Sequence, residues 1–139
     1  MKVKEVMHHG ASWIDPDAPI SDVAERMRKE DIGAIPIGDK DRLIGMVTDR
    51  DIVVRGLSGM ADPLQLTARD VMSEPIVYCS ANEELDDAIR IMERKQIRRL
   101  PVIDEHRRLV GMLSLGDVAA QGTALLCAEA LRAVSAHHA

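Results

Sequence analysis

One stretch of the sequence occurs twice, and this duplication limits the folds that the chain can adopt. Each copy has a short apolar run interrupted by one glycine, then a hydroxyl side chain, then a carboxylate three residues later. The first copy spans residues 43–51, with Gly45, Thr48 and Asp51, and the second spans residues 109–117. A duplicated pattern in so short a chain predicts two copies of one structural unit that must pack together to bury a core.

The repeat extends well beyond this stretch. Before a charged turn the matching positions lie 65 residues apart, and after it they lie 66 apart. One inserted residue in the turn explains the change, because turns tolerate insertions better than strands do. The matched pairs include Met7 with Met72, Trp13 with Tyr78, Asp22 with Asp87, Pro36 with Pro101, Gly45 with Gly111, Thr48 with Ser114, and Asp51 with Asp117.

Each copy predicts a strand, a helix, two strands and a final helix. The expected first strands are the short runs 12–14 and 76–78. The helices that follow carry one apolar stripe at the i, i+3, i+4, i+7 spacing, starting at Ile20 in the first copy and at Leu85 in the second. Two nearly continuous apolar strands come next in each copy. The last helix begins just after the hydroxyl residue.

The predicted fold class is α+β, with two β-α-β-β-α repeats packed sheet to sheet about a pseudo-two-fold axis. Neither repeat can cover its own sheet on both faces, so packing the two sheets together would bury the remaining apolar surfaces. This arrangement places two equivalent clefts at the strand ends. We assign residues 1–60 to the first repeat, 61–67 to a linker, 68–121 to the second repeat and 122–139 to a helical tail.

Composition argues against several classes of protein. A net charge of −5 leaves no excess of Lys and Arg for a nucleic-acid surface. No apolar run reaches the ~20 residues needed to cross a bilayer. Two cysteines are too few for a disulfide scaffold, and reduced thiols predict a cytoplasmic protein. The sequence lacks a nucleophile elbow, a zincin motif and a Walker loop, so we do not predict an enzyme.

The hydroxyl and the carboxylate of each cleft suit a nucleotide. A hydroxyl where a helix begins can donate to a phosphate oxygen beside unpaired backbone amides. An ionised carboxylate only accepts hydrogen bonds, so it suits the two hydroxyls of a ribose. Cationic side chains would bind phosphate and apolar ones would hold a purine. The candidate residues are Thr48, Arg50, Asp51, Ile14 and Ile37 in the first cleft, and Arg98, Arg99, Ser114, Asp117, Val77 and Val102 in the second.

These residues also have a purely structural interpretation. A Ser or Thr with an Asp at a helix start is a common capping pair, and duplication would copy a cap as readily as a binding site. The same holds for the four basic residues Arg94, Lys95, Arg98 and Arg99, because cations are favoured at a helix end whatever they bind. Trp13 and Tyr78 are expected to fill the core or an interface. The clefts could therefore be filled by the protein's own side chains.

Two pairs of neighbouring histidines, His8 with His9 and His137 with His138, suggest a metal- or redox-linked module together with Cys79. Neighbours in sequence do not converge on one ion without a special turn, and Cys79 has no evident base partner. We therefore predict no metal site and no obligatory cofactor.

The duplicated motifs resemble those of the CBS-domain family, in which two repeats form a Bateman module. They are residues 32–37 and 44–51 in the first copy and residues 97–104 and 110–117 in the second. The resemblance covers residues 1–121. In length, in the Thr-Asp-Arg-Asp turn and in the long mid-linker, the chain is similar to the small stand-alone CBS pairs of the hypoxic-response type.

This resemblance implies a regulatory module that forms homodimers and binds an adenosine ligand: AMP, ADP, ATP, S-adenosylmethionine or NADH. The family's hydroxyl-x-x-Asp motif falls on Thr48 with Asp51 and on Ser114 with Asp117, and its basic pair falls on Arg98 and Arg99. The first copy has Gly33 and Ala34 in the places of the basic pair. The first cleft therefore departs from the family pattern for phosphate binding, and in the second cleft Gly116 removes a side chain that some members use.

Two functions remain as alternatives. The first is a cytoplasmic sensor that binds an adenine nucleotide in the clefts and signals through a homodimer to a protein partner. The second is a stress-response scaffold or protein-interaction module without a nucleotide. In that alternative the tail after residue 121 holds a partner or a second subunit. Neither function involves DNA or a membrane.

Overall fold

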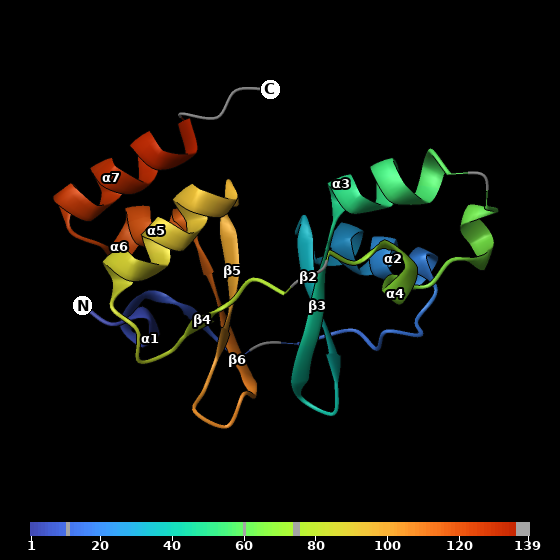
Figure 1. Cartoon of the computed structure of the whole chain (residues 1–139), viewed down its shortest axis with the longest axis horizontal. Helices are drawn as coiled ribbons and strands as arrows, with labels where there is room; N and C mark the ends of the chain where they lie inside the picture. Colours follow the sequence, from blue (N-terminus) through green and yellow to red (C-terminus); the bar gives the residue numbers. More distant parts are fainter. Residues whose placement is uncertain (11, 60, 74–75, 136–139) are drawn as a thin grey trace. The chain divides into compact units, whose positions relative to one another are not determined.

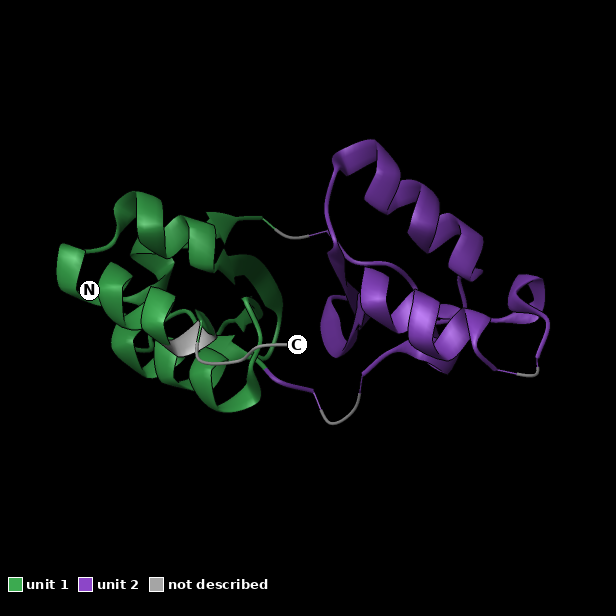
Figure 2. Ribbon diagram, turned by 90° about the horizontal axis from the view of Figure 1, so that it is seen from above, with its two compact units in different colours: residues 1–11, 78–139 green, residues 12–77 purple. Residues whose placement is uncertain are grey.

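The chain forms two structural units whose boundaries cut across the sequence repeats. The computed structural model describes residues 1–10, 12–59, 61–73 and 76–135. Unit 1 contains residues 1–11 and 78–139, and unit 2 contains residues 12–77 (Figure 2). The predicted α+β class is confirmed in both units. The packing of one sheet against the other stays a prediction.

Unit 1 is a four-stranded sheet with helices over one of its faces (Figure 1). The strand order is β1-β6-β5-β4, in which β4 runs parallel to β5 and the other pairs are antiparallel. Its elements are α1 (Val3–Val6), β1 (His8–His9), β4 (Cys79–Ser80), α5 (Leu85–Lys95), β5 (Arg99–Ile103), β6 (Leu109–Ser114), α6 (Leu115–Gln121) and α7 (Ala124–Ser135).

Unit 2 repeats this plan around an antiparallel pair of strands, β2 and β3. Isolated bridges from Ile14 to Ile37 and from Ser73 to Met46 extend the pair on both sides, where unit 1 has β4 and β1. The elements are α2 (Ile20–Glu30), β2 (Ala34–Asp39), β3 (Arg42–Thr48), α3 (Asp49–Asp51), the π-helix η1 (Ile52–Leu57), the 3-10 helix η2 (Pro63–Gln65) and α4 (Ala68–Val71).

Each repeat contributes its first segment to the unit built by the other repeat. His8 of the first repeat pairs with Met112 of the second, and Ser73 of the second repeat bridges Met46 of the first. The helices α1 and α4 come just before these contacts, and each buries two side chains in the unit that it joins. The two repeats are therefore exchanged at their beginnings.

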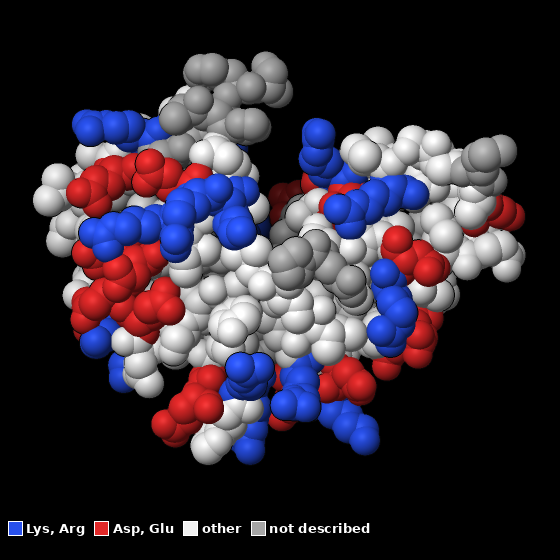
Figure 3. Space-filling model, viewed as in Figure 1, with Lys and Arg blue, Asp and Glu red and all other residues white. Residues whose placement is uncertain are grey.

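The apolar stripe predicted for the first helix of each repeat is confirmed in full for α5, whereas in α2 its i+4 position, Ala24, is exposed. Helix α2 buries Ile20, Val23 and Met27, and α5 buries its stripe from Leu85 to Met92. On the solvent side of α5, Arg90 pairs with Asp87 at 2.6 Å and lies 3.8 Å from Asp86. Figure 3 shows the resulting mixture of acidic and basic side chains over this helix.

The first strands lie later than predicted or are shorter. Residues 12–14 contribute one bridge, from Ile14, and the strand predicted at 76–78 is instead β4, Cys79–Ser80. Cys79 stands 65 residues after Ile14 and is buried like it, so it takes the matching place. The prediction followed the β-branched residues and left the small apolar Cys79 outside the strand.

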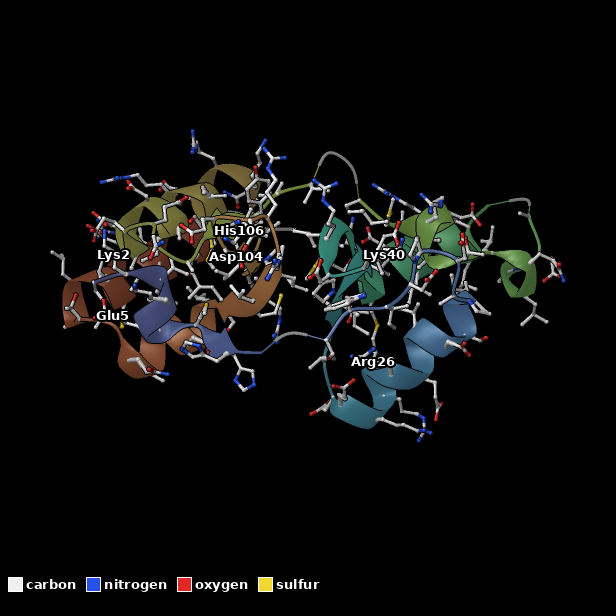
Figure 4. The ribbon with its side chains drawn as sticks, turned by 90° about the horizontal axis from the view of Figure 1, so that it is seen from below. Lys2, Glu5, Arg26, Lys40, Asp104 and His106 are labelled. Carbon is white, nitrogen blue, oxygen red and sulfur yellow. The ribbon has the colours of Figure 1, made fainter. Side chains whose placement is uncertain are left out.

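The turn between β5 and β6 is organised by Asp104. Its Oδ1 accepts hydrogen bonds from the backbone N–H groups of His106 at 2.8 Å and Arg108 at 2.9 Å. Figure 4 labels Asp104 and His106 at this turn. These donors, Arg108 first, lower the pKa of the Asp104 carboxyl.

No helix in the part of the chain that the structure describes is long and apolar enough to span a membrane.

Candidate functional site

Both predicted hydroxyl–carboxylate pairs form reciprocal caps at the starts of helices. In unit 2, Thr48 Oγ1 accepts from the Asp51 N–H at 3.1 Å, and Asp51 Oδ2 accepts from the Thr48 N–H at 2.8 Å. In unit 1, the matching distances for Ser114 and Asp117 are 3.0 and 2.9 Å. Both pairs are therefore helix caps, and whether they also bind a ligand stays a prediction. Each box uses one carboxylate oxygen and leaves Oδ1 for other partners.

In unit 1 the structure brings the predicted basic pair next to this cap. Arg99 is the registered partner of Ser114 across β5 and β6, and the Leu115 N–H donates to the Arg98 carbonyl at 3.0 Å. Both guanidinium side chains are exposed, and the structure records no ion pair for either within the residues it describes. One end of the sheet, where β5 begins and β6 ends, therefore brings together Arg98, Arg99, Ser114 and Asp117.

Unit 2 has a different charge at the matching edge. Ala34 is the registered partner of Thr48, and the Asp49 N–H donates to the Gly33 carbonyl at 3.0 Å. A Cβ on Gly33 would lie 3.1 Å from Asp49 Oδ2, so the Asp49 carboxylate occupies the side of Gly33 where a side chain would begin. Arg50 is exposed beside it. In unit 1 two exposed arginines adjoin the cap, whereas in unit 2 the cap is adjoined by the Asp49 carboxylate and by one exposed arginine, Arg50.

A residue that the sequence analysis did not assign also contacts the first cap. Ser73 Oγ donates to Asp51, at 3.2 Å from Oδ2 and 3.4 Å from Oδ1. Ser73 belongs to the exchanged segment, and its match in unit 1 is His8, 65 residues earlier. The constant offset between the repeats was the signal that could have paired these two positions.

The apolar residues predicted as cleft walls are mainly core residues. Ile37 and Val102 are 0% exposed, and Ile14 lies with Ile37 in the hydrophobic core of unit 2. Val77 is half-buried. Contact between these side chains and a purine stays a prediction, and for Ile37 and Val102 it would require the core to open.

Those residues of the metal or redox interpretation that the structure describes form no metal site. Burial raises the pKa of the Cys79 thiol to about 12, and the nearby Glu83 carboxylate adds to the shift, so the reactive thiolate is suppressed. His8 and His9 are exposed, but successive strand residues point to opposite faces. Among the described residues, no group of three His, Cys, Asp or Glu side chains could hold a metal ion. His137 and His138 lie outside those residues.

The family model for the CBS domain matches residues 3–57 and, a second time, residues 68–121. The chain belongs to the CBS-domain family. It is a tandem CBS pair, and the two matches follow the two sequence repeats rather than the two structural units.

Relatives of the hypoxic-response type are similar over most of the chain. Hypoxic response protein 1 of Mycobacterium tuberculosis is 43% identical over 117 residues, which cover 84% of this chain and 81% of the relative. A crystal structure of Hypoxic Response Protein I with two coordinated zinc ions has 41% identity and a TM-score of 0.80, covering 87% of this chain and 98% of that chain. The predicted resemblance to this type is confirmed.

Two more distant solved structures share the fold. CBSX2, crystallised in complex with AMP, has 23% identity and a TM-score of 0.77, covering 86% of this chain and 93% of that chain. The CBS domain pair of protein MJ0100, in complex with 5-methylthioadenosine and S-adenosyl-L-methionine, has 24% identity and a TM-score of 0.76, covering 86% and 94%.

Proposed function

We propose that this CBS pair is a regulatory module that binds an adenosine nucleotide beside the cap of Ser114 and Asp117. The observation that carries the proposal is the position of Arg98 and Arg99, whose backbones adjoin that cap and whose side chains are exposed. Two adjacent cations without recorded partners favour an anionic ligand, because guanidinium and phosphate form strong charge-assisted hydrogen bonds.

The residues of the cap divide the ligand between them. Asp117 Oδ2 remains in the capping box, and Oδ1 would accept hydrogen bonds from ribose hydroxyls. Arg98 and Arg99 would bind the phosphate groups. A nucleoside monophosphate needs both kinds of partner, so AMP, ADP or ATP fits better than a nucleoside without phosphate. S-adenosylmethionine and NADH are titrated alongside these nucleotides in the experiment described below.

The comparisons support the ligand class. CBSX2 was crystallised with AMP, and the MJ0100 pair was crystallised with two adenosine compounds. At 23% and 24% identity these proteins share the fold with this chain, so the choice of ligand rests on the residues of the cap. We further propose that the ligand acts through a homodimer on a protein partner in the cytoplasm.

Calorimetric titration tests the proposal. AMP, ADP, ATP, NADH and S-adenosylmethionine are each titrated to millimolar concentration, and we expect AMP, ADP or ATP to bind. The variant R98A/R99A should bind at least ~10-fold more weakly, as expected for the loss of charge-assisted hydrogen bonds. The variant R94A/K95A is the matched control, because it removes the same charge from exposed positions of the same unit. Equal weakening by both variants, or no heat with any ligand, would contradict the proposal.

A second candidate function is a nucleotide-independent interaction module. The observation that favours it is α7, whose Leu125 and Leu131 side chains are 70% and 63% exposed. A chain that ends at residue 122 lacks this helix. If its mass in solution falls from dimer to monomer while no nucleotide binds the full chain, the interaction module replaces the sensor.

Zinc is also tested, because Hypoxic Response Protein I holds two zinc ions at 41% identity. The described residues of this chain do not fit a zinc site by themselves. A site would need ligands from a second copy or from His137 and His138. Elemental analysis of the chain after dialysis against zinc gives the number of ions bound.

A further inference from the structure

The carboxylates of the two caps differ in what they already bind. Asp51 in unit 2 accepts a hydrogen bond from Ser73, and Asp117 in unit 1 has no such partner within the described residues. We propose that the chain binds one nucleotide, at the Asp117 cap, because Ser73 and Asp49 close the Asp51 cap. This inference rests on the proposed function and assigns its ligand to one of two duplicated sites.

Ser73 stands where a hydroxyl group of the ligand would stand. Its Oγ lies within hydrogen-bond distance of both Asp51 oxygens, at 3.2 and 3.4 Å. With the Thr48 N–H also bound to Oδ2, this carboxylate already accepts hydrogen bonds from two groups of the protein. A ribose hydroxyl would have to displace the Ser73 hydroxyl or share the carboxylate with it.

The chain holds Ser73 firmly in this place. The Ser73 N–H donates to the Met46 carbonyl at 2.9 Å, which fixes the segment on β3. The preceding residue is fixed as well, because Arg55 Nη1 donates to the Met72 carbonyl at 2.8 Å. The backbone of Ser73 is therefore held beside Asp51, and the Ser73 hydroxyl competes with a ligand from this position.

Asp49 closes the same cap to phosphate. Its carboxylate lies against Gly33, and Gly33 and Ala34 take the positions that Arg98 and Arg99 take in unit 1. A phosphate here would meet the Asp49 carboxylate beside one arginine, Arg50, whereas the other unit offers two arginines and no carboxylate in the place of Asp49. In unit 1 the position of Asp49 is taken by Leu115, which is uncharged.

The Asp117 cap lacks both obstacles. The position that matches Ser73 is His8, and no hydrogen bond from its side chain is recorded in the described part of the chain. Oδ1 of Asp117 therefore remains available as an acceptor. The duplication supplies the same capping box twice, and the residues around it leave one of the two open to an anionic ligand.

Equilibrium dialysis with radiolabelled AMP tests this inference on the full chain. We expect one AMP per chain. The variant D117N should weaken binding at least ~10-fold, and D51N should change it less than ~2-fold, because both remove one capping carboxylate and only one of these faces the ligand. If D117N does not fold, R98A/R99A takes its place, since both side chains are exposed.

A triple variant reverses the closure. A34R/D49L/S73A gives the Asp51 cap the arginine and the leucine of unit 1 and removes the competing hydroxyl, so we expect two AMP per chain. Binding of two AMP by the natural chain, equal weakening by D51N and D117N, or one AMP on the folded triple variant would overturn the inference and leave the proposed function standing. An absence of AMP binding by the natural chain at millimolar concentration would overturn both.

Discussion

A Cβ on Gly111 would lie 2.6 Å from the carbonyl oxygen of His8, closer than real Cβ atoms approach an oxygen. The matching glycine of the other repeat, Gly45, also has no room for a side chain, since a Cβ there would lie 2.5 Å from Met72 Sδ. In both units the exchanged segment lies directly against the strand. The glycine in the middle of the duplicated stretch is therefore the residue that allows the two repeats to exchange their first segments.

The substitution Gly111→Ala should lower the free energy of unfolding by about 2 kcal/mol, because the new methyl group meets backbone that cannot rotate away. Gly45→Ala should cost less, because it meets the flexible end of a methionine side chain. Urea denaturation of the two variants measures the difference. A cost for Gly45→Ala that equals or exceeds the cost for Gly111→Ala would contradict this account.

The sequence predicted the elements of the repeat but not the exchange between repeats. The offset of 65 residues is the same whether Met7 and His8 pack on their own repeat or on the other one. Only three-dimensional contacts distinguish the two arrangements, such as the pairing of His8 with Met112 and the contacts of Gly45 and Gly111. Helix ends were also hard to predict, since α2 ends at Glu30 and its C-cap, Asp31, adopts the left-handed conformation in which glycine is the expected residue.

The candidate site was predicted in its polar part and less well in its apolar part. The hydroxyl and the carboxylate of each cap are three residues apart on one chain segment, so sequence spacing brings them together. A nearly continuous apolar strand does not show which side chains face the core, and Ile37 and Val102 proved to be fully buried. Ser73 comes from a distant segment and was not predicted to contact Asp51.

The two caps should differ in their contribution to stability. Asp51→Ala removes the acceptor for the Thr48 N–H and for the Ser73 hydroxyl, whereas Asp117→Ala removes the acceptor for the Ser114 N–H alone. We expect Asp117→Ala to lower the free energy of unfolding by about 1 kcal/mol, as for the loss of a cap, and Asp51→Ala by about 1 kcal/mol more, as for one additional hydrogen bond.

Urea denaturation without nucleotide gives these values, and Ser73→Ala provides the control. In the Ser73→Ala background the difference between the two aspartate variants should disappear, because the additional hydrogen bond is already absent. If the difference persists there, Ser73 is not its cause.

The two cysteines should differ sharply in reactivity. Cys79 is 1% exposed and its pKa is raised to about 12, mainly by burial. Cys127 is half-buried, and its Sγ donates to the Val118 carbonyl at 3.0 Å. At pH 8 a thiol reagent should modify Cys127 within the folded chain and modify Cys79 only in denaturant. Modification of Cys79 as fast as Cys127 would contradict the burial.

The pKa of Cys79 also predicts how stability changes in alkali. Its ordinary value is 9.0, so above this pH the thiol ionises in the unfolded chain and stays protonated in the folded one. The stability from burying the neutral thiol is complete below pH 9 and is lost as the pH rises toward 12. Thermal unfolding from pH 8 to 11 should therefore show a shallower decline for Cys79→Ala than for the natural chain. Parallel declines would contradict this linkage.

Trp13 should report the packing of unit 2 through its contact with Gly38. A Cβ on Gly38 would lie 2.8 Å from Trp13 Cδ1, so the indole ring lies directly on the backbone of β2. Gly38→Ala should push the ring toward water, shift the emission maximum to longer wavelength and lower the free energy of unfolding by about 2 kcal/mol. Because the chain has one Trp, the emission comes from this site alone.

Gly59→Ala is the matched control for this prediction. A Cβ there would lie 3.5 Å from the Arg55 carbonyl oxygen, an ordinary contact distance, and the residue is exposed. We expect its emission maximum to match that of the natural chain. An unchanged spectrum for Gly38→Ala would show that the indole ring does not rest on β2, and the proposed packing of Trp13 would be wrong.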